Sequence, residues 1–255
     1  KMLLPLEKDR THRAEVNFLI GIATLSELQK ETDGKRRMNA YIEAVGRLYN
    51  VAQWEPNFKD RFSPTTQINQ VRQSLTKYAK ELPLETLTID QFNSDTSLLA
   101  MLDIIKRLGK KELANQLLNA AHKAYPESNS LWLSRAEIHL TQNEPLVALE
   151  FINQVKSFDQ LTAEELLTYA AGQIAAAKQM KSPGIEPFAR SYHALNIAEQ
   201  LPGDSVFKTL IPRIKKTIFK LLPPKSDQLS TASLTEAEKK SLKKLLKDAA
   251  ESKAR

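Results

Sequence analysis

Apolar residues recur three or four positions apart along most of the chain, which is the spacing that places side chains on one face of an α-helix. The first two helices are expected over residues 11–30 and 36–54. A third is expected over residues 63–78, because Ser63 and Pro64 suit the N-cap and the first position of a helix. No segment shows the alternation that is typical of a strand. The pattern therefore predicts an all-α fold.

The second half of the chain continues as pairs of helices. Residues 82–94 are rich in Pro, Thr and Asp, and we place the main internal boundary there. Two pairs are expected over residues 95–128 and 129–162, and a looser pair over 163–180 and 188–201. The chain is thus a run of helical hairpins from residue 95 onward.

Two further helices are expected after these pairs. One begins at Asp204, is strongly apolar on one side and ends before Pro223. The other is lysine-rich and follows a capping box at Thr235 and Glu238, which matches the one at Thr162 that precedes the third pair. Its apolar stripe is narrow, so it is expected to be weakly docked or mobile.

The first two pairs share a pattern at a fixed offset of 34 residues. An offset of this length is typical of a solenoid, in which each hairpin buries its apolar face against its neighbours. Small residues should allow the paired helices to approach closely, and Gly109 and Asn143 should adopt the left-handed geometry of the turn between them. The positions that match are Leu98, Leu102, Gly109, Ala114, Ala121 and Pro126 in the first pair, and Trp132, Ala136, Asn143, Ala148, Val155 and Gln160 in the second.

This pattern resembles the tetratricopeptide repeat. The resemblance is clear over residues 95–128 and partial over 129–162, where Arg135 and Gln160 depart from the family's usual Leu and Pro. Leu166 and Ala170 keep the spacing in the third pair, whose second helix matches only after an insertion of about nine residues. The alternative is generic packing of helical hairpins, since related repeats share this periodicity.

The resemblance implies a right-handed helical-hairpin solenoid. We expect an N-terminal helical region over residues 1–90, a solenoid with a C-terminal capping helix over 91–225, and a charged tail helix over 226–255.

In this family the first helix of each pair lines a concave groove that binds another protein. Leu99, Leu133 and Leu167 recur at the 34-residue offset and would form an apolar stripe across three pairs. Such a groove suits an amphipathic helix or a peptide. In the alternative, the chain's own terminal helices cover the stripe. The full set of expected groove residues is Leu99, Asp103, Lys106, Arg107, Leu133, Glu137, Leu140, Leu167, Ala171 and Ile174.

One subtype of the family is excluded by its motif. The clamp that holds the acidic C-termini of chaperones needs Lys, Asn, Asn, Lys and Arg at set groove positions. Here those positions are Leu99, Asp103, Ser134, Glu164 and Thr168, and none of them matches. We therefore expect a partner other than a carboxylate-clamp ligand.

The composition excludes some kinds of site but leaves the predicted fold unchanged. The chain has 255 residues, a formal charge of +7, seven glycines and no cysteine, so disulfides and thiolate metal sites are excluded. No apolar run reaches the length of a membrane span. The sequence does not distinguish a cytoplasmic from a periplasmic location, and an anchor or signal upstream of Lys1 remains an open alternative.

No catalytic or cofactor motif is present. The four histidines are far apart, and neither a metal-binding pattern nor a phosphate loop occurs, so we expect no metal, no cofactor and no enzymatic activity. A basic surface is expected on the helix after Asp204, either as the polar face of a solenoid cap or as a site for a polyanion. Its residues are Lys208, Arg213, Lys215, Lys216 and Lys220.

The sequence thus predicts a non-catalytic scaffold or adaptor that binds a partner helix or peptide in a concave apolar groove, within a multiprotein assembly. The alternatives are a basic module that binds RNA or an anionic membrane surface, and a regulatory segment of a larger enzyme. Binding to a polyanion would weaken steeply with salt, whereas apolar binding would not.

Overall fold

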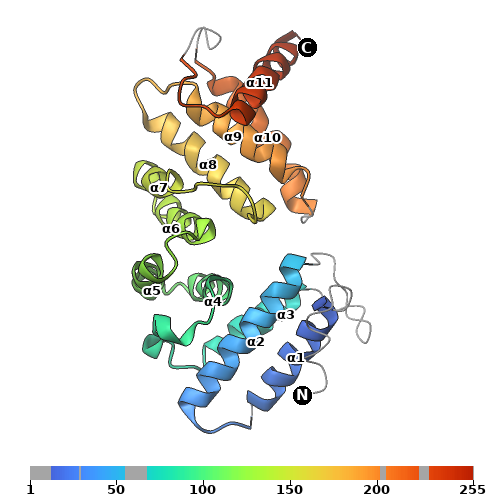
Figure 1. Ribbon diagram of the computed structural model, residues 1–255, viewed down its shortest axis with the longest axis vertical. Helices are drawn as coiled ribbons and strands as arrows, with labels where there is room; N and C mark the ends of the chain where they lie inside the picture. The colour runs from blue at the N-terminus through green and yellow to red at the C-terminus, as the bar shows by residue number, and fades with distance from the viewer. Residues whose placement is uncertain (1–12, 29, 55–67, 202–204, 224–229, 255) are drawn as a thin grey trace. The chain divides into compact units, whose positions relative to one another are not determined.

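The regular structure of the described residues is entirely helical, which confirms the expected all-α class. The computed structural model describes residues 13–28, 30–54, 68–201, 205–223 and 230–254 (Figure 1). The expected caps at Ser63 and Asp204 lie outside them. The described helices are α1 (Arg13–Leu28), α2 (Gly34–Trp54), α3 (Ile68–Ala79), the 3-10 helices η2 (Leu84–Thr86) and η3 (Ile89–Gln91), α4 (Asp95–Arg107), α5 (Lys111–Ala124), α6 (Asn129–Thr141), α7 (Pro145–Ile152), α8 (Ala163–Gln179), α9 (Glu186–Ala198), α10 (Ser205–Leu221) and α11 (Glu236–Ala254).

The chain forms two compact units, Lys1–Leu131 and Trp132–Arg255, so that the division falls within α6. The segment where the sequence placed an internal boundary, residues 82–94, packs into the first unit. Its Leu84 and Phe92 are buried, and the Phe92 carbonyl accepts a hydrogen bond of 3.0 Å from the Tyr125 hydroxyl at the end of α5. Two 3-10 turns give this Pro-containing stretch the local hydrogen bonds that burial requires.

In the first unit, α1 packs against α2, and α2 packs against α4 (Figure 1). Buried residues on one face of α2 drive this packing, and Tyr41 is fully buried among them. Its hydroxyl donates a hydrogen bond of 2.6 Å to the Leu75 carbonyl of α3, which supplies the partner that a buried hydroxyl needs.

In the second unit, α8 packs against α7 and α9, and α10 and α11 complete the core (Figure 1). Gly172 allows the close approach of α8 to α7, because a Cβ atom there would lie 2.2 Å from Cδ1 of Ile152. Across α6 and α7, Phe151 stacks with both Trp132 and His139, with ring centroids 6.3 and 5.3 Å away. These contacts fix the hairpin on which the next pair packs.

Helix bounds recur at the offset found in the sequence. Helices α4, α6 and α8 begin at Asp95, Asn129 and Ala163, each 34 residues after the one before. The turn residues Gly109 and Asn143 both have positive φ, 73° and 61°, which confirms the left-handed geometry expected of them. Ala114, Ala121, Ala136 and Ala148, the small residues of the pattern, are all fully buried.

The regularity ends in the second half of the second pair. Helix α7 has 8 residues, whereas α5 has 14. The segment after Ile152 instead places the Phe158 ring against Tyr169, with centroids 4.8 Å apart and the rings edge to face. The chain then turns at Gln160, which has a φ of 70°. Val155 therefore lies outside α7, although Ala121 at the matching position lies within α5, whereas Gln160, like its counterpart Pro126, lies beyond the helix.

The C-terminal helix α11 packs along α9. Both expected capping boxes are confirmed, since Thr235 and Glu238 make the same reciprocal hydrogen bonds as Thr162 and Glu165. Leu242 and Leu245 of α11 enter the core, and the Tyr192 hydroxyl of α9 donates to Asp248. The narrow apolar stripe is thus supplemented by polar contacts across the two helices.

Candidate binding surface

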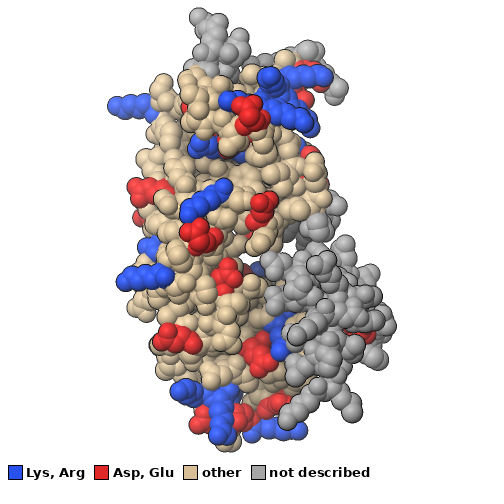
Figure 2. Space-filling view, viewed as in Figure 1, with Lys and Arg blue, Asp and Glu red and all other residues tan. Residues whose placement is uncertain are grey.

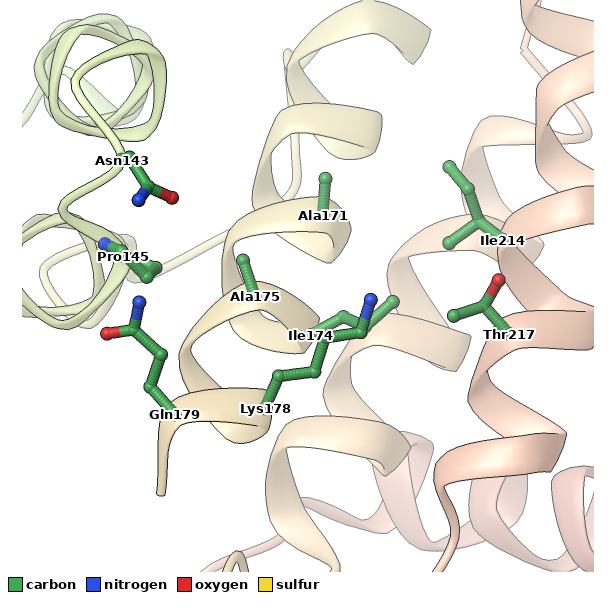
Figure 3. Close-up of a pocket in the computed structure, with 9 residues that line it drawn as sticks. All are labelled: Asn143, Pro145, Ala171, Ile174, Ala175, Lys178, Gln179, Ile214 and Thr217. Carbon is green, nitrogen blue, oxygen red and sulfur yellow. The ribbon is translucent and has the colours of Figure 1, made fainter.

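The second unit contains a hollow of about 370 Å³ between the α6–α7 turn, α8 and α10 (Figure 3). Its volume is at the lower end of the roughly 300–1,000 Å³ that ligand pockets occupy. The lining residues are Asn143, Pro145, Ala171, Ile174, Ala175, Lys178, Gln179, Ile214 and Thr217.

Helix α8 forms the floor of this hollow. Nine of its residues that face its neighbours are apolar or glycine and are buried, which leaves a narrow outward stripe. Ala171 and Ala175 lie on that stripe one turn apart, and Lys178 follows on the same side (Figure 3). The outward stripe of a surface helix usually carries long polar side chains. Here two methyl groups occupy it, and that is why the surface is hollow.

Helix α10 forms one wall. Ile211 and Ile218 are buried in the core and hold the helix in place. Ile214 and Thr217 are half-buried and line the hollow beside α8 (Figure 3).

The α6–α7 turn forms the opposite wall. The positive φ of Asn143 turns the chain so that Pro145 can start α7, where a missing N–H is tolerated. Between them, the Glu144 carboxylate lies 2.8 Å from Nδ1 of His139. The carboxylate on this wall is therefore already engaged within the hairpin.

The structure places the expected groove residues of the second unit in two groups. Ala171 and Ile174 line the hollow. Leu133 and Leu167, two members of the expected apolar stripe, are only 1% and 7% exposed and belong to the core. Glu137 and Leu140 are half-buried and do not line the hollow. A charged substitution at Leu133 would disturb the core, so it is not a clean probe of the surface.

In the first unit, the expected groove residues lie on α4, and Asp103 is already paired. Its carboxylate accepts hydrogen bonds from the Tyr49 hydroxyl of α2 and, at 2.9 Å, from Nε of Arg107. Burial alone would raise the pKa of Asp103, but these two donors and the positive charges of Arg107 and Lys106 outweigh it and hold the pKa below its ordinary value. Leu99 is half-buried on the same helix.

The residues of the expected basic surface on α10 do not share one environment in the structure. Lys215 is mostly buried at its side chain, pairs with Glu199 at 2.9 Å and lies 5.1 Å from the centre of the Tyr192 ring. Arg213, Lys216 and Lys220 are exposed, and the side chain of Lys208 lies outside the described residues. On the face seen in Figure 2, basic and acidic side chains are interspersed over α11.

A histidine–serine pair escaped the sequence analysis, because 48 residues separate its members. Nδ1 of His193 on α9 lies 3.0 Å from Oγ of Ser241 on α11. Ser241 is only 8% exposed, and the nearby Glu238 carboxylate already pairs with Arg190 at 3.5 Å and caps its own helix. The arrangement links α9 to α11 and presents no accessible nucleophile.

Burial lowers the pKa of His193, and the negative charge of Glu238 opposes this shift. The ring therefore favours its neutral form at neutral pH. Among the described residues, no group of three or more His, Cys, Asp or Glu side chains is placed to hold a metal ion.

Of the α8 residues that line the hollow, the expected groove set contains Ala171 and Ile174 and omits Ala175, Lys178 and Gln179, and it contains none of the residues of the walls. Lys178 follows Ala171 by seven residues, so helical periodicity alone could have added it. Ile214, Thr217 and Pro145 carry no such signal, because their place at the hollow depends on how three elements pack.

No protein-family model, no curated protein and no solved structure matches this chain. None of the helices in the described residues is long and apolar enough to cross a membrane.

Proposed function

We propose that this protein is a non-catalytic interaction module whose second unit binds a segment of a partner protein in the hollow over α8. The observation that carries this proposal is the outward stripe of α8, where Ala171 and Ala175 form an open floor between two walls.

The chemistry of the hollow suits a protein side chain as the occupant. Ala171, Ala175 and Ile214 offer apolar surface, and each Å² of apolar surface removed from water contributes about 25 cal/mol. Alanine has no rotamers to immobilise, so the floor loses little side-chain entropy when it is covered. A single large apolar side chain seated here would act as the anchor that typically dominates the affinity of an interface.

The recurrence of helix bounds supports a solenoid as the setting of this site. Helix α8 is the first helix of the third pair, and its start at Ala163 keeps the 34-residue offset. In a tetratricopeptide-like arrangement the first helices line the binding face, and we assign that role to α8. The proposal therefore retains the groove but moves its centre from the leucine stripe to the alanine stripe.

The test is a binding experiment with matched substitutions. A displayed library of random peptides is selected on the wild-type protein, and the enriched peptides are measured against Ala171→Trp and Ala250→Trp. Both alanines are exposed on helices of the second unit, but only Ala171 lines the hollow. An indole at position 171 would fill the hollow, so affinity should fall by about tenfold or more, equivalent to about 1.4 kcal/mol.

Ala250→Trp should leave the affinity unchanged. Peptides that bind both variants as well as the wild type would refute the proposal. Binding of anionic polymers that weakens steeply with salt and ignores position 171 would support the polyanion alternative instead.

A further inference from the structure

The hollow has one ionisable lining residue, and it is a cation. Lys178 projects from the last turn of α8 toward α10, across the side of the hollow that Ile174 and Thr217 border (Figure 3). It forms no ion pair within the described part of the chain. A lysine in this position holds its charge at the edge of an apolar surface.

The wall opposite the α6–α7 turn extends this positive charge. On α10, Arg213 and Lys220 are seven residues apart and therefore share one line along the helix. That line lies next to the one that carries Ile214 and Thr217. Both side chains are exposed, in contrast to Lys215, whose charge Glu199 already neutralises.

The acidic residue that adjoins the lining in sequence, Glu144, does not itself line the hollow. Its carboxylate is held by His139 at 2.8 Å. None of the nine lining residues is acidic. The hollow therefore combines an apolar floor with cationic edges on α8 and α10.

We propose that the occupant of the hollow is an acidic protein segment. It places one apolar side chain on the alanine floor and carboxylates beside Lys178 and Arg213. This inference rests on the proposed function and adds the charge of the partner. Carboxylates at such edges would speed association and exclude basic segments, since like charges brought together repel.

The experiment reads the charge of the peptides that the hollow selects. Peptides enriched from the random library on wild-type protein, and sensitive to Ala171→Trp, should carry Asp or Glu on both sides of an apolar residue. The double variant Lys178→Glu, Arg213→Glu should weaken their binding by about tenfold or more, equivalent to about 1.4 kcal/mol. The matched double variant Lys240→Glu, Lys243→Glu changes exposed lysines of α11 and should have no effect.

Each result that would contradict the charge inference points to a different conclusion. Enriched peptides that are neutral or basic but still depend on Ala171 would overturn the charge inference and leave the proposed function intact. Peptides whose affinity is unchanged by Ala171→Trp would overturn both the charge inference and the proposed function. Binding to phosphatidylserine vesicles that the Lys178→Glu, Arg213→Glu variant abolishes, without any binding of acidic peptides, would replace the peptide by a lipid surface.

Discussion

Asp103 on α4 and Ala171 on α8 occupy the same position of the repeat, two offsets apart, yet their surroundings differ. Asp103 is tied to Tyr49 of α2 and to Arg107, so its carboxylate is committed within the first unit. Ala171 is exposed and contributes to the floor of a hollow. A position expected to face a partner is thus used for internal structure in one unit and is open in the other.

The difference lies in what packs beside each helix. In the first unit, α2 lies against α4 and supplies a hydroxyl to the repeat position. In the second unit, the neighbours of α8 leave Ala171 exposed and Ala175 half-buried. A repeat position therefore indicates which way a side chain faces, and the neighbouring helices determine whether it is available.

The largest expected effect contrasts a buried alanine with the open one. Ala148 is fully buried between α7 and its neighbours, so Ala148→Trp should lower the free energy of unfolding by about 3 kcal/mol or more, at the upper end of the range for overpacked cores. Ala171→Trp should change it by less than about 0.5 kcal/mol, as is usual for surface sites. Urea unfolding followed by circular dichroism measures both, and equal effects would contradict the assigned burial.

The next effect tests the contact of α8 with α7. Gly172→Ala should destabilise the protein by about 1–2 kcal/mol, because the added Cβ would meet Cδ1 of Ile152. Ile152→Val removes that methyl group, so in its background Gly172→Ala should cost less or even stabilise, since Ala is the better helix former by about 1 kcal/mol. A double-mutant cycle of unfolding free energies measures the coupling, and strict additivity would argue against this contact.

The third comparison exchanges the residues at the two repeat positions, Asp103 and Ala171. Asp103→Ala should cost about 1–2 kcal/mol, because the Tyr49 hydroxyl loses a charged acceptor. Ala171→Asp should change stability by less than about 0.5 kcal/mol. Thermal melting of the two variants compares them directly. If Asp103→Ala proves neutral, the Tyr49 contact contributes nothing to the first unit.

The smallest effect is on pH dependence. Because the pKa of His193 is lowered in the folded state, the unfolded chain binds the proton first as the pH falls below the ordinary value of about 6.5. Stability should therefore decrease between that value and the lower folded pKa. Urea midpoints at about pH 7.5 and about pH 5.5 should show a smaller decrease for His193→Gln than for the wild type. An identical decrease would show that His193 does not contribute.

The sequence was most informative where its signals are local. The capping boxes at Thr162 and Thr235 and the left-handed turns at Gly109 and Asn143 depend on a few neighbouring residues, and all four are confirmed. The all-α class follows from the same kind of evidence, because helical spacing reports one helix at a time.

The sequence was least informative about features that depend on packing between helices. The expectation that Leu133 lines a groove came from the repeat pattern, but Leu133 is almost fully buried because of the core that packs around it. Helix α7 ends at Ile152, and the segment after it places Phe158 against Tyr169 of the next helix, a contact that local spacing does not predict. The hollow brings together residues about forty positions apart, such as Ala171 and Ile214, and no local pattern encodes that arrangement.

NMR of alanine methyl groups, recorded during titration with a peptide selected on the wild-type protein, locates the binding site on the second unit. If the peptide binds in the hollow over α8, shift changes should be concentrated at Ala171 and Ala175, and the exposed methyl groups of Ala124 and Ala250 should be unaffected. Changes at Ala124 or Ala250 while Ala171 and Ala175 stay constant would contradict binding in the hollow.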